Sequence, residues 1–285
     1  MKIVISADME GTTGVVEGIH VRPPDQANPA GSSAAEYGWA RLTMTREVNA
    51  AIEGALEAGA EQVIVNESHD GMRNLLPEEL HREALLISGA HKPLSMAQGV
   101  DEPGVAGLIY TGYHAKAGTP NGVLAHTYVG FIRDVRLNGV SVGEYGINAA
   151  VAGHFGVPVI MVTGDDHTVR QTQELLGERV VGVIVKRGIG TNSAIHLHPA
   201  KARDLIREGA AEAVRRIPEL KPYNPGWPCR VEVDVDHQVQ ADLATIVPGV
   251  ARNGERGFVF TAEDGVQLVT IWRAVLNAMM TRFAV

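Results

Sequence analysis

The sequence predicts an α/β fold, with a mainly parallel sheet and flanking helices in the N-terminal part and a smaller α+β region in the C-terminal part. Three observations predict it. Residues 2–7 (KIVISA) form a short apolar run typical of a buried strand, a helical pattern covers residues 41–58, and a second strand-like run (QVIVN) lies at residues 62–66. Two strands around a helix make a βαβ unit, whose strands run parallel with a right-handed crossover.

The remaining elements of the first half follow from turn and breaker residues. The helix over residues 41–58 ends at Gly59, and residues 17–38 before it are rich in Pro, Gly, Ala and Ser, which predicts a long loop. Asn138-Gly139 predicts the turn of a hairpin. Strands are predicted at residues 84–88, 108–111 and 122–127, and the hairpin over residues 136–142.

The second half of the sequence also alternates between strand-like and helical patterns. Pro199 is a good first-turn residue, so it opens a helix that closes before Pro218. The other predictions are a helix over residues 143–154, a strand at 158–163, a helix through Leu176, strands at 180–185 and 230–236, and a terminal helix over 263–283. A change in character between residues 165 and 190 predicts two domains, residues 1–175 and 176–285.

Composition limits the classes of function. The chain has 285 residues, of which 45% are hydrophobic and 20% charged, so it can bury a core. Its formal charge of −8 argues against nucleic acid or an anionic membrane as a partner. Cys229 is the only cysteine, so a metal site must be built from His, Asp and Glu. The first residues lack the apolar core of a secretory signal, and the apolar stretch at 149–162 is broken by Gly and Pro, so we expect a cytoplasmic protein.

Candidate metal ligands follow predicted strands at the ends where parallel sheets bind ligands. Asp8 and Glu10 come directly after the first strand, in SADMEG, where Gly11 makes a turn easy, and His69 follows the second strand, in VNESHDG. Each residue also has an ordinary interpretation: the two acids could be solvated loop residues, and a histidine after a strand is often structural.

Three further residues extend this set. His114 follows the predicted strand at 108–111, His126 ends the run at 122–127, and Glu144 lies in the first turn of a helix, where it could merely complement the helix dipole. Taken together, three carboxylates and two imidazoles can hold two divalent ions if one carboxylate bridges them. The mixed nitrogen and oxygen donors suit Zn²⁺ best, with Mn²⁺ or Co²⁺ as substitutes.

Competing sites carry weaker signals. His196 and His198 would point to one side of a strand but have no third ligand nearby in the sequence. Asp165 and Asp166 follow a strand and could approach the same crevice, although Asp166 is more simply the N-cap of the next helix. Cys229 is interpreted as a small buried hydrophobe. The sequence contains no phosphate-binding glycine loop, nucleotide fingerprint or serine nucleophile elbow.

Five ordered blocks give the sequence a resemblance to a known family. SADMEG, VNESHDGMRNL, GYHAKAGTPNGVLAH, VGEYGINAAVAG and PVIMVTGDD resemble, in order and spacing, the motifs of the D-aminopeptidase family, whose members have also been called dipeptide-transport proteins. The match runs from Met1 to about Asp166 and is weaker in the last third. Two departures are a long loop from Val15 to Gly38 and an extra residue at Asn121.

The resemblance implies a ligand set and an assembly. The family's proteins are binuclear zinc aminopeptidases that form a ring-stacked decamer with enclosed active sites. Carried over by position, Asp8 would bridge the two ions, Glu10 and His114 would complete one position, and His69 and Glu144 would complete the other. His126 matches the family's catalytic histidine.

The expected function is therefore a cytoplasmic, zinc-dependent aminopeptidase that removes the N-terminal residue from short peptides or aminoacyl amides, with D-amino acids as substrates. Metal-activated hydroxide would attack the peptide carbonyl, while His126 protonates the departing amine or stabilises the oxyanion. The family's own assignment, a covalent histidine nucleophile, is the second choice. The alternatives are another binuclear metallohydrolase, acting on a phosphoester or cyclic amide, and a non-enzymatic dipeptide-binding protein.

Overall fold

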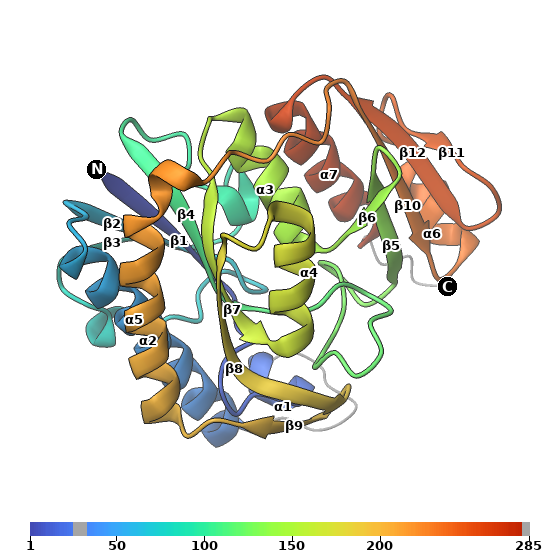
Figure 1. Cartoon of the computed structure of the whole chain (residues 1–285). Coiled ribbons are helices and arrows are strands. Elements are labelled where there is room, and N and C mark those ends of the chain that lie inside the picture. Colours follow the sequence, from blue (N-terminus) through green and yellow to red (C-terminus); the bar gives the residue numbers. More distant parts are fainter. Residues whose placement is uncertain (25–32, 281–285) are drawn as a thin grey trace.

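The computed structural model describes residues 1–24 and 33–280, and it contains a large, mostly parallel sheet and a smaller antiparallel one (Figure 1). The large sheet consists, in spatial order, of β3 (Ala84–Ile87), β2 (Gln62–Glu67), β1 (Lys2–Ala7), β4 (Val105–Tyr113), β7 (Val159–Asp165), β8 (Val181–Gly190) and β9 (Ser193–His196). Its pairs are parallel except for β8 with β9. The predicted fold class is confirmed.

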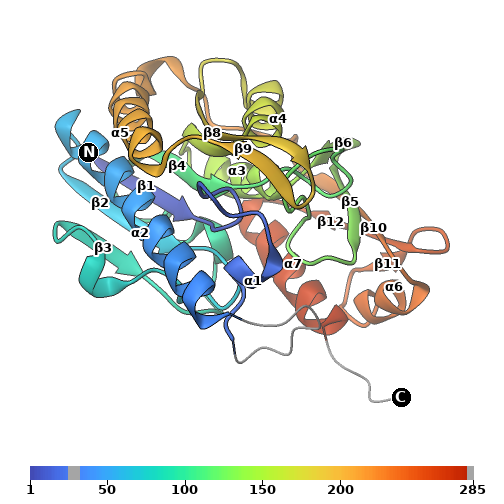
Figure 2. The same cartoon turned by 90° about the horizontal axis from the view of Figure 1, so that it is seen from below.

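Helices cover both faces of the large sheet. Successive side chains of a strand point to opposite faces, so each strand contributes to two hydrophobic cores. Ile3 and Ile5 of β1 belong to the core beneath α2 (Ala34–Glu57) and α5 (Pro199–Arg215). Val4 belongs instead to the core that includes α3 (Glu144–His154) and α4 (Asp166–Leu176). Seen from below, α2 and α5 lie together on one side of the sheet (Figure 2).

The small sheet extends the second core. It contains β11 (Ala251–Arg252), β12 (Gly257–Ala262), β10 (Cys229–Val235), β5 (Ile132–Leu137) and β6 (Val140–Val142), all paired antiparallel. Helices α6 (Gln238–Ala244) and α7 (Gly265–Met279) follow β10 and β12. The hairpin of β5 and β6 is confirmed, with Asn138 and Gly139 at φ 49° and 83°. Helix α7 packs against α3, which joins the two sheets (Figure 1).

The chain enters both sheets more than once. β5 and β6, from the middle of the sequence, belong to the small sheet, whereas β8, β9 and α5 lie beyond residue 175 and belong to the large sheet with its helices. Sheet membership therefore does not change at a single point. The division into residues 1–175 and 176–285 stays a prediction.

Several predicted boundaries were wrong. β4 and β8 extend beyond the strands predicted at 108–111 and 180–185, and α7 begins at Gly265 instead of residue 263, while the predicted end of that helix at 283 lies outside the described residues. Helix α2 begins at Ala34 instead of residue 41, because Ser33 caps it by accepting a hydrogen bond from the Glu36 amide. A short helix, α1 (Gly18–Val21), also lies within the predicted loop 17–38, part of which falls outside the described residues. The N-cap of α4 is Asp165 rather than Asp166.

The predicted strand at residues 122–127 is wrong. Asn121 and Leu124 adopt left-handed backbone conformations, with φ of 60° and 50°, which a strand cannot contain. Only an isolated bridge between Thr127 and Val129 remains. Val123 and Thr127 are buried, so the segment needs apolar residues as a buried strand does, and its composition resembled that of a strand.

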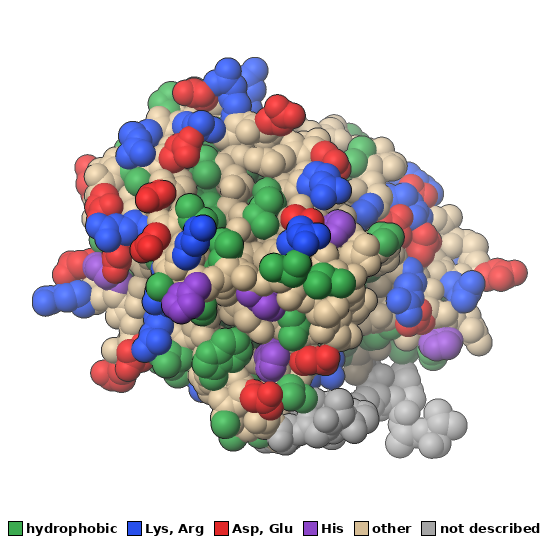
Figure 3. All heavy atoms as spheres, turned by 60° about the horizontal axis from the view of Figure 1, so that its bottom comes forward, with side chains coloured by type: hydrophobic (Ala, Val, Ile, Leu, Met, Phe, Trp, Pro, Cys, Tyr) green, Lys and Arg blue, Asp and Glu red, His purple; other side chains and the backbone are tan. Residues whose placement is uncertain are grey.

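Short 3-10 helices occupy connections: η1 (Pro77–Glu79), η2 (Ser95–Ala97) and η3 (Ile217–Glu219). None of the described helices combines the length and apolar character needed to cross a membrane. On the face shown in Figure 3, acidic and basic side chains are interspersed with apolar ones. That face therefore presents no uniformly charged surface.

Candidate metal centre

The predicted ligands meet at the carboxyl edge of three neighbouring strands. Asp8 and Glu10 follow β1, His69 follows β2, and His114 follows β4, and β1 lies between β2 and β4 in the sheet. Strand order reverses direction beside β1, because β2 and β3 lie on one side of it and β4, β7 and β8 on the other. Such a switch point opens a crevice at the carboxyl edge of a parallel sheet.

Two glycines allow the segments after β1 and β4 to approach each other closely. The Gly11 amide donates a 2.7 Å hydrogen bond to the carbonyl oxygen of Gly112. A Cβ atom on Gly11 would lie 1.9 Å from the carbonyl oxygen of Tyr113, and one on Gly112, which has φ of 66°, would lie 2.3 Å from that of Asp8. Gly11 is therefore required less for a turn than for this close contact.

One group of ligand atoms surrounds His69. Its Nδ1 lies 3.2 Å from Oδ1 of Asp8 and 3.0 Å from Oε2 of Glu10. These atoms lie within 4.8 Å of one another, and all three residues are buried. One divalent ion could therefore bind all three side chains.

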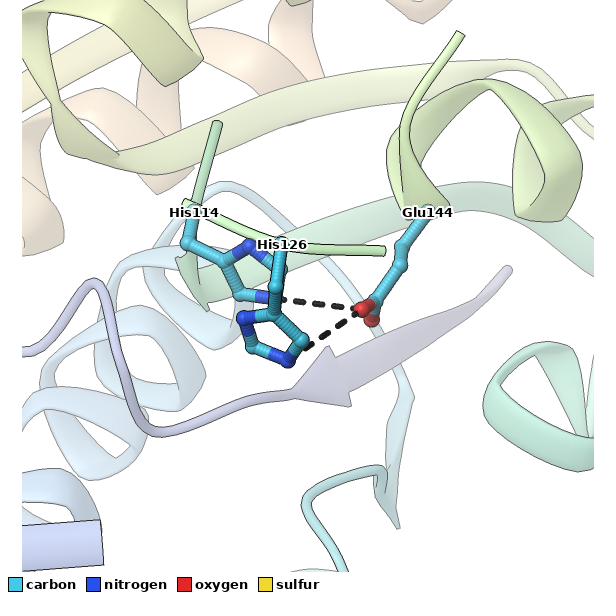
Figure 4. Close-up of side chains that lie close together, drawn as sticks. All are labelled: His114, His126 and Glu144. Atoms are coloured by element: carbon cyan, nitrogen blue, oxygen red, sulfur yellow. Dashed lines mark ion pairs between the residues drawn. The ribbon is translucent and has the colours of Figure 1, made fainter. Parts of the chain in front are cut away.

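A second group surrounds Glu144, the first residue of α3 (Figure 4). Its Oε1 lies 3.1 Å from Nε2 of His114 and 3.8 Å from Nε2 of His126, and the two imidazole rings stack with centroids 4.0 Å apart. The Tyr128 amide donates a 2.6 Å hydrogen bond to the same oxygen. Asp8 connects the groups, because its Oδ2 lies 3.5 Å from Nε2 of His114.

Backbone carbonyls fix which nitrogen of each histidine faces the site. A carbonyl only accepts, so the ring nitrogen beside it must carry the proton. His69 donates from Nε2 to Val21, at 2.7 Å, while His114 donates from Nδ1 to Ala115, at 3.1 Å. His126 donates from Nδ1 to Leu124, at 2.8 Å. The opposite nitrogen of each ring is thus directed toward the carboxylates, as in metal-bound histidines.

The carboxylates lack enough hydrogen-bond donors in the chain itself. Oδ2 of Asp8 and Oε2 of Glu10 are buried and have no hydrogen bond within the described residues. Burial and the neighbouring charge of Glu10 raise the pKa of Asp8 to about 7. Although burial alone would lower it, the pKa of His114 rises to about 10 beside Glu144. The site therefore favours added positive charge, and its residues fit divalent cations with mixed nitrogen and oxygen ligands.

His126 differs from the other two histidines. Burial and the nearby His114 lower its pKa, whereas the acidic neighbours of His69 hold the pKa of that ring well above its usual range, although burial opposes this. The side chain of His126 is also 26% exposed, against 8% and 2% for His69 and His114. His126 thus lies at the more exposed side of the site, with a pKa shifted in the opposite direction from those of His69 and His114.

The two groups form one wall of a cavity of about 740 Å³. Apolar side chains from distant segments complete it: Met72, Met96, Val129, Phe131 and Leu276. Arg273 of α7 also lines it, and so does Asp70, at φ 47° beside His69. The sequence analysis did not predict that α7 lines this cavity. The pattern of an amphipathic helix shows which face is apolar, but it does not show which part of the protein that face packs against.

The competing residues serve structural roles instead. His196 accepts a hydrogen bond from the Gly14 amide, and His198 caps α5 by accepting one from Ala200. Asp165 accepts from the Val123 and Thr168 amides, so both of its oxygens are used. The groups of His, Cys, Asp and Glu that could share an ion within the described residues include none of these three.

Comparison with known proteins shows what the whole chain is similar to. A family model described as D-aminopeptidase matches residues 1–274. The D-aminopeptidase of Bacillus subtilis strain 168 is 38% identical over 285 residues, which cover 100% of this chain and 98% of that protein. A solved structure described as the Zn-dependent D-aminopeptidase DppA from Bacillus subtilis, a self-compartmentalizing protease, superposes with a TM-score of 0.91 and 35% identity, covering 100% of both chains.

Proposed function

Because the chain belongs to the D-aminopeptidase family, we propose that it is a zinc-dependent aminopeptidase that removes the N-terminal residue from short peptides or aminoacyl amides. D-amino-acid substrates are proposed from the similarity to the Bacillus subtilis enzyme. The observation that carries the proposal is the meeting of Asp8, His69 and His114 at three adjacent strand ends, with buried carboxylate oxygens that accept no hydrogen bond among the described residues.

The geometry suggests how the ligands divide between two ions. The carboxylate of Asp8 would bridge them, since its two oxygens face His69 and His114 respectively. Glu10 would then join His69 in one position, and Glu144 would join His114 in the other. The family resemblance implies a different division, in which Glu10 joins His114 and Glu144 joins His69. Bound ions would supply Lewis acidity and lower the pKa of water at the site.

The chain's own contribution to catalysis would come from His126. Its Nε2 lies 3.9 Å from Glu10 and 3.8 Å from Glu144, on the side of the site that opens to the cavity. Because Nδ1 donates its hydrogen bond to the Leu124 carbonyl, Nε2 is the ring nitrogen that can exchange a proton with a substrate or water. It would accept a proton from the attacking water and return it to the departing amine, as a general base and then a general acid. The neutral form favoured by its lowered pKa suits the first step.

The cavity suits a short substrate. A volume of about 740 Å³ lies within the range of small-molecule sites and holds a di- or tripeptide, whose apolar side chains could contact Met96 and Phe131. We also propose a homo-oligomer that encloses the active sites, because the related DppA is described as a self-compartmentalizing protease, and the family resemblance suggests that it is a decamer. Light scattering would test the assembly, and a monomer or dimer at working concentration would refute it.

A matched substrate panel tests the function. Purified protein is assayed with zinc on D- and L-aminoacyl amides, an aryl phosphate and a cyclic amide, and its zinc content is measured after extensive dialysis. We expect turnover of the D-aminoacyl amides and close to two zinc ions per chain. Hydrolysis of only the phosphate or the cyclic amide would point to a different metallohydrolase, and tight peptide binding without turnover would point to a binding protein.

A further inference from the structure

A buried lysine lies behind the metal centre, outside the proposed ligands. Lys186 of β8 is 1% exposed. Its Nζ donates hydrogen bonds to the carbonyl oxygens of Glu10, Thr12 and Val15, at 2.5, 3.0 and 2.7 Å. A lysine ammonium carries three N–H donors, so all of them are used on one loop.

That loop is the segment that carries Asp8 and Glu10 out of β1. Its amides are held from other directions, because Thr13 donates to Glu47 at 3.0 Å and Gly14 donates to His196 at 3.0 Å. Three of its buried carbonyls converge on the ammonium of Lys186. Without that cation they would lose their shared donor in a place that excludes water.

Charge points to the same role. Glu10, Glu47 and Asp165 are the acidic residues whose charges act on Lys186. All three are buried, so their repulsion is poorly screened by solvent. A fixed cation behind Glu10 offsets part of this repulsion and leaves the carboxylate free to face His69.

We propose that Lys186 is a positioning residue that holds the loop of Glu10 and thereby sets the affinity of the metal position formed by Asp8, Glu10 and His69. This inference rests on the proposed zinc-dependent function. Lys186 does not line the substrate cavity, and its hydrogen bonds go to backbone carbonyls, so it would act through the backbone of the loop and through its charge.

The first test compares two substitutions at neighbouring positions of β8. Lys186→Met keeps the aliphatic chain but removes the charge and the donors, whereas Val185→Ala removes packing from a fully buried residue and leaves the loop's hydrogen bonds in place. Zinc affinity is measured by competition with a chromogenic chelator, alongside the melting temperature of the metal-free protein. We expect Lys186→Met to weaken one of two zinc equivalents by about 10- to 100-fold, the usual effect of losing a group that orients a ligand. Val185→Ala should lower the melting temperature with both affinities unchanged.

A double-mutant cycle separates positioning from general destabilisation. In a Glu10→Gln background, Lys186→Met should have little further effect on zinc affinity, because the carboxylate it orients is gone. In a Glu144→Gln background it should keep its full effect. Equal effects in the two backgrounds, or unchanged zinc affinities in folded Lys186→Met, would overturn the proposal.

Two results distinguish this inference from the proposed function. Wild-type protein that holds no zinc would overturn both, whereas wild-type protein with two zinc ions and an unaffected Lys186→Met variant would overturn this inference alone. If Lys186→Met does not fold, Lys186→Gln carries the same measurements, because its amide keeps two of the donors. Because that variant still lacks the charge and one donor, we expect a smaller loss of affinity at the same zinc equivalent. An equal loss at both equivalents would count against Lys186 as a positioning residue.

Discussion

The two sheets each hold a cluster of charged side chains, and the clusters differ in how they are neutralised. On the small sheet, Arg136 donates to Asp134 at 2.6 Å and to Asp234 at 2.7 Å, and these three side chains are 24%, 26% and 44% exposed. At the edge of the large sheet, the side chains of Asp8 and Glu10 are 3% and 6% exposed, and each has an oxygen with no hydrogen bond within the described residues.

The contrast separates two kinds of acidic cluster. The first is paired with its own arginine and is partly exposed, so it needs no ligand and is expected to contribute little to stability. The second collects three buried carboxylates around histidines, an arrangement that is costly unless further positive charge enters. A cluster of acids therefore indicates a metal site only when it is buried and its oxygens exceed the donors around them.

Removing Asp8, the residue that connects the two groups of ligands, should give the largest effect. Asp8→Ala takes away the carboxylate that lies between His69 and His114, so we expect both zinc ions to be lost and turnover to fall by more than about 10⁴-fold. The matched variant His69→Ala should weaken the binding of mainly one zinc ion. Metal analysis after dialysis checks both variants. Retention of two ions by Asp8→Ala would show that the acidic cluster is not the site.

His126→Ala should separate the catalytic group from the ligands. We expect both zinc ions and the assembly to remain, while turnover falls by about 10²- to 10⁴-fold, the usual contribution of a general acid or base. Zinc content, melting temperature and turnover are measured on one preparation. Loss of one zinc ion would instead make His126 a ligand beside His114 and Glu144, and full activity with zinc bound would remove it from the mechanism.

A core substitution in the small sheet should change stability without changing the metal site. Phe258 of β12 is fully buried, so Phe258→Ala is expected to cost about 3–5 kcal/mol of unfolding free energy. Urea denaturation followed by circular dichroism measures this loss. The folded variant should still bind two zinc ions, and a lower zinc stoichiometry in folded protein would mean that the two regions are coupled.

The smallest effect is expected at the satisfied cluster. Arg136→Ala removes partly exposed ion pairs with Asp134 and Asp234, and we expect the free energy of unfolding to change by less than about 1 kcal/mol. Zinc content and turnover should match those of the wild type. A loss of several kcal/mol of unfolding free energy in the same urea experiment would contradict the view that this exposed cluster contributes little to stability.

The sequence predicted the fold class and the neighbourhood of the ligands because both depend on local signals. Short apolar runs predicted β1 and β2. Residues just beyond parallel strands lie at the same edge of the sheet, so the sequence alone predicted that Asp8, Glu10, His69 and His114 lie close together. That these residues bind metal, and that His126 is catalytic, remain predictions.

The rest depends on contacts between distant residues. The segment at 122–127 has the composition of a strand, yet Asp165 holds the Val123 amide in an irregular loop. Lys186 lies just beyond the predicted strand at 180–185, and its three carbonyl partners lie more than 170 residues earlier in the chain. A charge in a strand carries no local sign that it will be buried.

The hairpin of β8 and β9 has a consequence for the order of folding. Besides Lys186, it supplies His196 to the Gly14 amide and the Thr191 carbonyl to the Leu124 amide, so it holds the loops of both Glu10 and His126. A chain emerging from the ribosome as far as β7 already contains every proposed ligand, but not the groups that fix them. Because such long-range contacts form late and slowly, the metal centre would mature only after most of the chain has been synthesised.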